Sequence, residues 1–190
     1  MRKINGVPIE SHTDLSSLKG GEVLKWDSST GKMVWEVEDG GVYRSVWYGG
    51  RGVFAGSYAS GTSDVIDYIT IASTGNATDF GDLSVTRYAI AAVEDGTRGV
   101  IGAGRSGGYV NTMDYVTIQS TGNATDFGDA TIAVKGRGPA SNGTRGVFAG
   151  GLDGSNYNVM DYITIANTGN ATDFGDLLEV ASNIAGMSGD

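Results

Sequence analysis

The chain has no cysteine, a single histidine and two prolines in 190 residues. The missing thiols exclude a disulfide framework, a thiolate zinc site and a cysteine nucleophile. With His12 as the only imidazole, the usual nucleophile–histidine triads cannot be assembled. His12 lies in a polar stretch outside the repeats described below, so it is expected to be an ordinary exposed side chain. The composition therefore argues against common hydrolase chemistry.

Long hydrophobic runs and stripes of basic residues are also absent. No segment approaches the length of a transmembrane helix, and the first eight residues carry charge without the apolar core of a signal peptide. Thirteen Lys and Arg against 22 Asp and Glu give a formal charge of −9. Such a field repels a phosphate backbone. We therefore expect no membrane insertion, no classical export signal and no nucleic-acid partner.

Glycine is abundant, at 32 of 190 residues. It does not follow the every-third-residue spacing of collagen, and proline is too scarce for a Pro-rich linker. Val, Ile, Tyr and Phe occur in short runs between the glycines, which is typical of short strands joined by tight turns. The composition predicts a folded all-β protein.

Three tandem repeats decide the predicted architecture. The segments Arg51-Gly-Val-Phe-Ala-Gly56 and Asp67-Tyr-Ile-Thr-Ile71 each recur twice, in nearly the same letters, at an offset of 47 residues. The segment from Thr74 to Asp82 recurs without change at 121–129 and 168–176. A fixed offset indicates structural repeats. We predict an N-terminal attachment segment at 1–40 and a three-repeat all-β domain at 41–190, with units 51–97, 98–144 and 145–190.

Each unit is expected to form a small sheet. In the first unit, strands are predicted at 52–55, 65–72 and 77–83, with a weaker fourth strand at 85–93. The second strand has apolar side chains on both faces, so both faces of the sheet should be covered by like neighbours. Propeller-type blades satisfy this, and so does a single-chain β-trefoil or prism. Three blades are too few to close a propeller, so a homo-oligomer such as a two-chain, six-bladed ring is expected.

The repeat resembles two known patterns. Its glycine-ended strand, Tyr-containing strand and third-strand aromatic are similar to the kelch blade, although Phe80, Phe127 and Phe174 stand where kelch would have Trp. Asp67-Tyr-Ile-Thr-Ile71 followed by Thr74-Gly-Asn-Ala-Thr-Asp-Phe-Gly-Asp82 resembles repeats of bacteriophage tail-fibre and other virion proteins. The resemblance covers residues 51–190 and implies a virion appendage.

The N-terminal segment predicts a β-hairpin. Residues 23–27 and 32–37 read as strands around the turn Ser28-Ser-Thr-Gly31, with Trp26 and Trp35 placed to pack across them. The stretch from Asp14 to Lys32 is similar to a short module of phage tail fibres. An isolated hairpin is barely stable in water. The resemblance implies that residues 1–40 attach to other virion proteins, and capping of the first sheet is the alternative.

The polar residues of the repeats have structural explanations. Asp67, Asp79 and Asp82 and their equivalents could be read as a glycosidase-like pair, but they occur in every unit, and turn capping accounts for them. Asn76, Asp79 and Asp82 offer oxygen ligands for calcium as a sharper alternative. Arg51, Arg98 and Arg145 are expected to bond carboxylates or carbonyls of a neighbouring unit. No cofactor or metal is assigned.

The loop after the first strand differs between units, which is where specific recognition can reside. These loops are rich in Gly, Ser and Asn and contain one Tyr each, a composition found in adaptable binding loops. Plain solvated turns are the alternative. The candidate binding residues are Tyr58, Arg105, Tyr109, Asp153, Asn156 and Tyr157.

These observations lead to three functional hypotheses. The first is a non-enzymatic virion structural protein, a tail fibre or fibre-like appendage made in the host cytoplasm, whose loops bind a host-surface glycan or protein. The second is a capsid decoration or cement protein held by the hairpin. The third is a polysaccharide-degrading enzyme, which the residues do not favour.

Overall fold

The computed structural model describes residues 3–4, 7–8, 22–27, 32–37, 50–59 and 61–188. The chain divides into two compact units, 1–46 and 47–190, so the division falls slightly later than the 40/41 boundary expected from the repeats. The described residues form antiparallel strands and no helix, which confirms the all-β prediction. Among them, accordingly, there is no helix of the length and hydrophobicity that a membrane span requires.

Two short strand pairs make up the described part of the first unit. Strands β1 (Lys3–Ile4) and β2 (Val7–Pro8) pair with each other, and β3 (Glu22–Asp27) pairs with β4 (Lys32–Val37). The second pair confirms the predicted hairpin. Trp26 lies opposite Met33 and Trp35 opposite Leu24. The turn at 28–31, His12 and the packing of the tryptophan rings lie outside what the structure describes.

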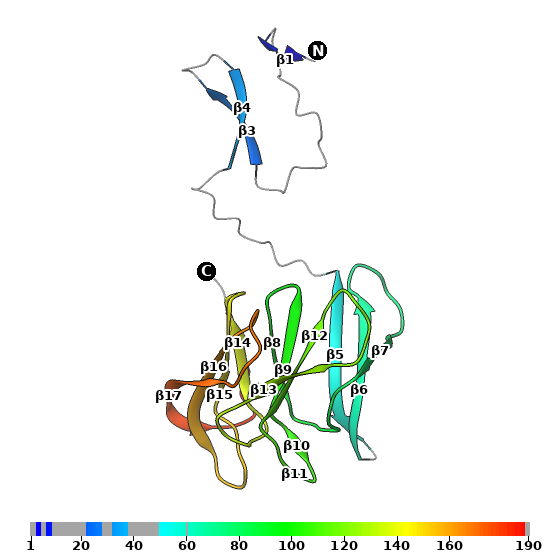
Figure 1. The fold of residues 1–190 in the computed structure, drawn as a ribbon, viewed down its shortest axis with the longest axis vertical. Coiled ribbons are helices and arrows are strands. Elements are labelled where there is room, and N and C mark those ends of the chain that lie inside the picture. Colours follow the sequence, from blue (N-terminus) through cyan, green and yellow to red (C-terminus); the bar gives the residue numbers. More distant parts are fainter. Residues whose placement is uncertain are drawn as a thin grey trace. The chain divides into compact units, whose positions relative to one another are not determined.

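The second unit contains three antiparallel sheets, one for each repeat, none of which closes on itself (Figure 1). In each sheet, strands adjacent in sequence are hydrogen-bonded neighbours. The first sheet consists of β5 (Arg51–Tyr58), β6 (Thr62–Thr70) and β7 (Thr78–Asp82). The second consists of β8 (Ala91–Glu94), β9 (Arg98–Gly102), β12 (Thr112–Thr117) and β13 (Thr125–Asp129). The third consists of β14 (Gly138–Ser141), β15 (Arg145–Ala149), β16 (Tyr157–Thr164) and β17 (Thr172–Ala181). A small hairpin, β10 (Arg105–Ser106) with β11 (Gly108–Tyr109), lies in the β9–β12 connection.

The predicted fourth strand at 85–93 needs correction. The strand in this region is β8, and it pairs with β9 of the following sheet. Residues 83–90 instead cross from the first sheet to the second, and the positive φ of Ala89, 54°, turns the chain into β8. Each complete sheet therefore takes its first strand from the end of the preceding repeat. The corresponding positions of the first sheet, 44–47, lie outside the described residues.

The hydrophobic core occupies the two spaces between successive sheets. Ile66 and Phe80 of the first sheet pack with Ile101 and Val116 of the second. On the opposite face of the second sheet, a larger cluster packs against the third sheet. It comprises Ala91, Val93, Val100, Met113, Phe127, Ala130, Phe148, Ile163 and Ile165. Neighbouring residues of β9, Val100 and Ile101, thus enter different clusters. The middle sheet is covered on both faces, as the apolar pattern of the strands indicates.

The same set of polar contacts joins each sheet to the next, at an offset of 47 residues. Arg51 Nη1 donates to the carbonyl of Ile118 at 3.0 Å, and Arg98 Nη1 donates to that of Ile165 at 3.1 Å. We call the side of a sheet that carries this arginine its Arg side. The facing side of the next sheet carries Asn123 or Asn170, and we call it the Asn side.

Backbone and amide contacts complete each junction. In the first junction the amide of Gly122 donates to the carbonyl of Phe80 at 2.7 Å, and the amide of Asp82 donates to Asn123 Oδ1 at 3.1 Å. The second junction repeats both. Its bonds run from Gly169 to Phe127 at 2.7 Å and from Asp129 to Asn170 Oδ1 at 3.0 Å. The repeated Thr-Gly-Asn-Ala-Thr-Asp-Phe-Gly-Asp segment is thus the sequence signature of this junction.

At each junction a buried ion pair joins an arginine of the connection to an aspartate of the sheet that follows. Asp114 accepts a bond from Arg87 at 2.9 Å, and both side chains are 0% exposed. The Ser84 amide and hydroxyl also donate to this carboxylate, at 3.1 and 2.6 Å. In the next junction Asp161 pairs in the same way with Arg137 and Thr131. Burial lowers the pKa of Arg87, while the charge of Asp114 opposes that shift.

The two arginines do not occupy equivalent repeat positions. The residue that corresponds to Arg87 is Val134, and Arg137 lies three positions further along the chain. Both nevertheless come from the connection that precedes the sheet they bond to, and both guanidinium groups also donate to a carbonyl of that sheet, Ile101 or Phe148. The buried carboxylate, rather than the position of the arginine, is therefore the fixed part of this contact.

We predict that Asp114→Ala destabilises the second unit strongly. The substitution leaves the guanidinium of Arg87 buried without its counter-charge, which costs about 3–5 kcal/mol. Urea unfolding followed by tryptophan and tyrosine fluorescence measures the loss. Asp126→Ala is the matched control, because Asp126 is exposed in the strand next to Asp114 and should change stability by less than about 0.5 kcal/mol. Equal effects of the two substitutions would contradict the assignment.

A pair of glycine substitutions tests the closeness of the junctions. A Cβ at Gly128 (φ 136°) would lie 2.5 Å from the backbone of Gly169, whereas one at Gly154 (φ 125°) would meet nothing within 4 Å. Both alanines are strained by about 1–2 kcal/mol, but only Gly128→Ala also forces the sheets apart. We expect Gly128→Ala to be the more destabilising by about 1–3 kcal/mol, measured by urea unfolding. Similar losses for both would show that the junction is loose.

Candidate binding surface

The three variable loops lie at one end of the second unit. They are the β5–β6 turn, the β9–β12 connection with its β10–β11 hairpin, and the β15–β16 connection, all at the lower end of this unit in Figure 1. Because each sheet is an up-and-down meander in the same sense, equivalent connections fall at the same end. The fold therefore gathers the sequence-predicted candidates on one surface.

Backbone bonds between neighbouring repeats fix these loops. Tyr88 and Arg105 exchange two amide–carbonyl bonds, at 3.2 and 3.0 Å. Lys135 and Leu152, their equivalents 47 residues later, exchange two bonds at 3.1 and 3.0 Å. In each case the connection that enters a sheet is bonded to the variable loop of that sheet. The loops are thus held at their bases and not only at their strands.

Three of the predicted candidates, Tyr58, Arg105 and Tyr109, belong to two small clusters in which a cationic side chain lies over a tyrosine ring. The exposed ring of Tyr58 packs on Tyr88 with centroids 4.8 Å apart, and Lys135 Nζ lies 5.1 Å from the Tyr88 centroid. Arg105 lies 5.2 Å from the centroid of Tyr109 within the β10–β11 hairpin. Such cation–π contacts hold the rings while leaving their other faces available.

The remaining candidates form a separate group in the third loop. The Tyr157 hydroxyl donates to Asp153 Oδ2 at 3.0 Å, and Ser182 Oγ donates to Asn156 Oδ1 at 2.9 Å. The bond to Asp153 raises the pKa of Tyr157, and the carboxylate charge adds to the shift. The structure therefore pairs Asp153 with Tyr157 and places Asn156, in the same loop, against Ser182.

Sequence reasoning missed Tyr88 and Lys135. Both lie in the connections between repeats, at equivalent positions occupied by different residue types. Their only sequence signal was a bulky side chain in a segment that we predicted to be a strand. Because the connection instead crosses between sheets, it brings them beside the variable loops. With Tyr58, Arg105 and Tyr109, these two residues place two cationic side chains and three tyrosines at one end of the unit.

The repeated polar residues have structural partners. Arg51 and Arg98 bond carbonyls of the next sheet. Arg51, Arg98 and Arg145 each lie 4.2 to 4.5 Å from the ring centroid of a tyrosine in their own sheet. Asn123 and Asn170, the equivalents of Asn76, accept backbone bonds across the junctions. Within the described part of the chain, no cluster of three or more His, Asp or Glu side chains could hold a metal ion.

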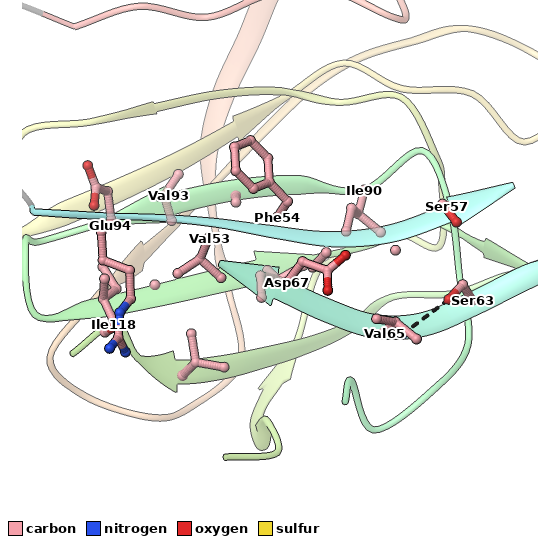
Figure 2. A pocket seen from close by; sticks show the side chains of 18 of the residues that line it. Val53, Phe54, Ser57, Ser63, Val65, Asp67, Ile90, Val93, Glu94 and Ile118 are labelled. Carbon is pink, nitrogen blue, oxygen red and sulfur yellow. Dashed lines mark hydrogen bonds between the residues drawn. The ribbon is translucent and has the colours of Figure 1, made fainter. Parts of the chain in front are cut away.

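A cavity of about 950 Å³ runs along one edge of β5. Figure 2 shows Val53 and Phe54, neighbours on β5, together with Asp67, Val93 and Ile118 on its walls. No strand among the residues described pairs with this edge. In the second and third sheets, β8 and β14 occupy the corresponding place beside β9 and β15. The cavity thus lies beside a strand edge for which the described residues supply no partner, where the second and third sheets have β8 and β14.

The walls of this cavity are mostly aliphatic. Carboxyl groups occur at Asp67 and Glu94. Burial raises the pKa of Glu94, and the neighbouring charge of Asp95 adds to the shift. Unlike the buried Asp114, its equivalent Asp67 is only partly buried. A space lined by strand edges and aliphatic side chains is suited to a polypeptide segment.

Comparison with known proteins does not assign the chain. No model of a known protein family matches it. A search of curated proteins finds no significant match either.

We predict that Asp153→Asn lowers the pKa of Tyr157. The charge of Asp153 disfavours the phenolate, and its carboxylate accepts the phenol hydrogen bond. Asparagine removes the charge and leaves only a weaker, neutral acceptor. Titration of ¹³Cζ-tyrosine-labelled protein by NMR above pH 9 measures the shift of this one resonance. The wild-type protein, labelled and titrated in the same way, is the control. An unaltered Tyr157 titration would contradict the bond seen here.

Proposed function

We propose that this chain is a non-enzymatic structural protein of a bacteriophage particle, a tail fibre or fibre-like appendage, and that its end loops contact the host surface. The virion assignment is supported by the repeat phrase at 67–82, 114–129 and 161–176 and by the hairpin module at 14–32. The confirmed strand pairing of β3 with β4 is consistent with that module.

We infer that the three sheets are propeller-type blades. Each complete sheet is a four-stranded meander, and successive sheets pack face to face around an apolar core. The amide of Asn183 donates to the carbonyl of Gly136, and the amide of Gly136 donates to that of Ala89, at 2.7 and 2.8 Å. These three positions are 47 residues apart, which supports a common inner axis. The blade interpretation is favoured over the trefoil or prism, where sheets are not stacked in this way.

The observation that carries the binding proposal is the gathering of Tyr58, Tyr88, Arg105, Tyr109 and Lys135 at one end of the unit. Planar rings and fixed cations suit the faces of sugar rings and the anionic groups of bacterial envelope glycans. A host protein is the alternative ligand. Among the described residues, no histidine and no metal-binding cluster lies beside these side chains. We therefore propose that the surface binds its ligand and does not catalyse a reaction.

Two kinds of protein partner complete the proposal. Residues 1–40 attach the chain to other virion proteins, since a hairpin of this size needs a surface to pack against. The chain also associates with itself, through contacts developed in the next subsection. Capsid decoration remains the second role for the same scaffold, and labelling the chain with an antibody in electron micrographs of intact particles decides between tail and shell.

A triple substitution tests the binding surface. Purified chain should compete with the phage for adsorption to its host, and Tyr58→Ala, Tyr109→Ala and Tyr157→Ala together should weaken that competition at least tenfold. Thr70→Ala, Thr117→Ala and Thr164→Ala form the control, because these exposed, repeat-related residues lie at the far ends of β6, β12 and β16. Undiminished competition by the tyrosine variant would remove the recognition role. Shortening of host polysaccharide by the purified chain would overturn the non-enzymatic assignment.

A further inference from the structure

The two internal junctions leave two sides without a described partner. The Arg side of the first sheet meets the Asn side of the second, and the Arg side of the second meets the Asn side of the third. The Arg side of the third sheet and the Asn side of the first are therefore the two halves of one more junction. No described residue of the 47–190 unit covers either of them.

We propose that the Arg side of the third sheet binds the Asn side of the first sheet in a second copy of this chain. The contacts are those of the internal junctions, apart from the buried ion pair and its hydroxyl bond. The proposal rests on the blade interpretation and the self-association given above, and not on the place of the chain in a virion. The proposal adds which two surfaces meet and that the partner is a second copy of this chain.

Exposure of otherwise buried side chains supports this assignment on the Arg side. Phe174 is 46% exposed, whereas its equivalents Phe80 and Phe127 are each 2% exposed. Its ring keeps the same edge-to-face contact with a tyrosine, Tyr162 at 6.1 Å. Arg145 stands 4.5 Å from the Tyr162 centroid, as Arg98 does from Tyr115 at 4.4 Å. The Arg side is thus built to the same plan as the internal ones.

The Asn side of the first sheet shows the complementary pattern. Ile71 is 61% exposed, while its equivalents Ile118 and Ile165 are 7% and 0% exposed. Phe54 is likewise exposed where Ile101 and Phe148 are buried. The sequence from Thr74 to Asp82 is identical to the segment that receives the contacts in the other sheets. Gly75 and Asn76 therefore offer the amide and the carboxamide oxygen that Gly122 and Asn123 use.

A glycine on the Arg side indicates how closely the two copies approach. A Cβ at Gly81 or Gly128 would lie 2.5 Å from the backbone of Gly122 or Gly169 across the junction. At Gly175 the same Cβ would meet nothing within 4 Å in the single chain. By repeat equivalence with Gly122 and Gly169, Gly75 of a second copy would occupy that point. Space that is empty in one chain becomes the tightest contact of the pair.

Two features of the third sheet differ from the internal junctions. Leu178 stands where Ser84 and Thr131 donate to the buried aspartates, so Asp67 of a second copy receives no hydroxyl there. Ala181 and Ile184 stand at the positions equivalent to Arg87 and Arg137, so Asp67 receives no arginine either. The new junction therefore lacks the buried ion pair of the internal ones and is weaker than they are. We accordingly expect association that depends on protein concentration.

The same arrangement supplies the missing strand of the first sheet. Residues 185–188 occupy repeat positions equivalent to β8 and β14. They follow Asn183, which is bonded to Gly136 as Gly136 is to Ala89. Met187 is 92% exposed, whereas its equivalent Val93 is buried. A first sheet docked on the third sheet of another copy brings the open edge of β5, with its 950 Å³ cavity, to residues 185–188.

Two identical junctions close a pair of chains into a ring of six sheets. Each junction is head-to-tail, so each copy uses both its Arg side and its Asn side on the same partner. A ring closed by two copies satisfies both sides of both chains. An arrangement that failed to close would instead add copies without limit.

Sedimentation velocity and light scattering of the full 190-residue chain between 1 and 200 µM test the proposal. We expect a species of twice the chain mass that dissociates on dilution. Gly175→Ala should weaken the association at least thirtyfold, because its new methyl group meets the backbone of the partner. Gly154→Ala is the matched control, since it has a similar φ, 125° against 128°, and the same empty surroundings in the single chain. It should leave the association unchanged.

A second variant keeps the test independent of strain at Gly175. Ile71→Asp places a charge on the Asn side at an exposed position, so the chain should fold and fail to pair. Because the contact is head-to-tail, an equimolar mixture of Ile71→Asp and Gly175→Ala chains retains one intact junction and should form a one-to-one pair. Two defects on a face that pairs with itself would not complement each other.

Three results would overturn the proposal. They are a wild-type chain that stays monomeric at 200 µM, an association that neither variant weakens, and a mixture that does not pair. A species larger than two chains would overturn closure by two copies. An unchanged pair after deletion of residues 185–190 would show that another segment, such as 44–47, fills the edge of β5. None of these results bears on adsorption, so failure here is distinguishable from failure of the virion role.

Discussion

The structure depends on one repeated contact, the approach of a glycine in one sheet to the backbone of a Thr-Gly-Asn turn in the next. At Gly81 and Gly128 the two backbones come so close that no side chain fits between them. This approach brings the carbonyl of Phe80 or Phe127 within 2.7 Å of a glycine amide. Sheets held at this distance can share a core, and the aromatic rings of the third strands are then buried from water.

Buried charges fix the register of one sheet on the next, which hydrophobic packing alone does not specify. A small sheet with apolar groups on both faces could slide on its neighbour with little loss of buried area. Asp114 and Asp161 remove that freedom, because each buried carboxylate is satisfied only when the preceding connection delivers an arginine and a hydroxyl to it. The ion pair thus specifies a register, at the cost of desolvating two charges.

The proposed role in host contact follows from the division of labour between the two ends of each sheet. The turns that form the junctions are identical in all three repeats and have no freedom to vary, since their amides and carbonyls are used by the neighbouring sheet. The connections at the other end are bonded to the neighbouring repeat only at their bases, and they differ in their side chains. Tyr58, Tyr109 and Tyr157 therefore stand on a rigid support whose loops can change without loss of the fold.

Strand positions, the all-β class and the repeat could be predicted from the sequence, because glycine-bounded β-branched runs at a fixed offset leave few alternatives. The strand at 85–93 was placed wrongly because a propensity pattern does not say which sheet a strand joins. In that segment, Arg87 forms a buried ion pair with Asp114 of the next sheet, and the chain crosses to that sheet. Tyr88 and Lys135 were missed for the same reason, since their closeness to Tyr58 depends on that crossing.

The sequence by itself determined that three like modules repeat every 47 residues, and that their shared turns must serve a shared purpose. Local spacing suffices for this, because each module is made of contacts near in the chain. Only the tertiary structure decided which face of each module meets the next, which carboxylates are buried and which residues line the cavity beside β5. Those outcomes depend on contacts between residues far apart in the chain, such as Asp82 with Asn123, and no local pattern encodes them.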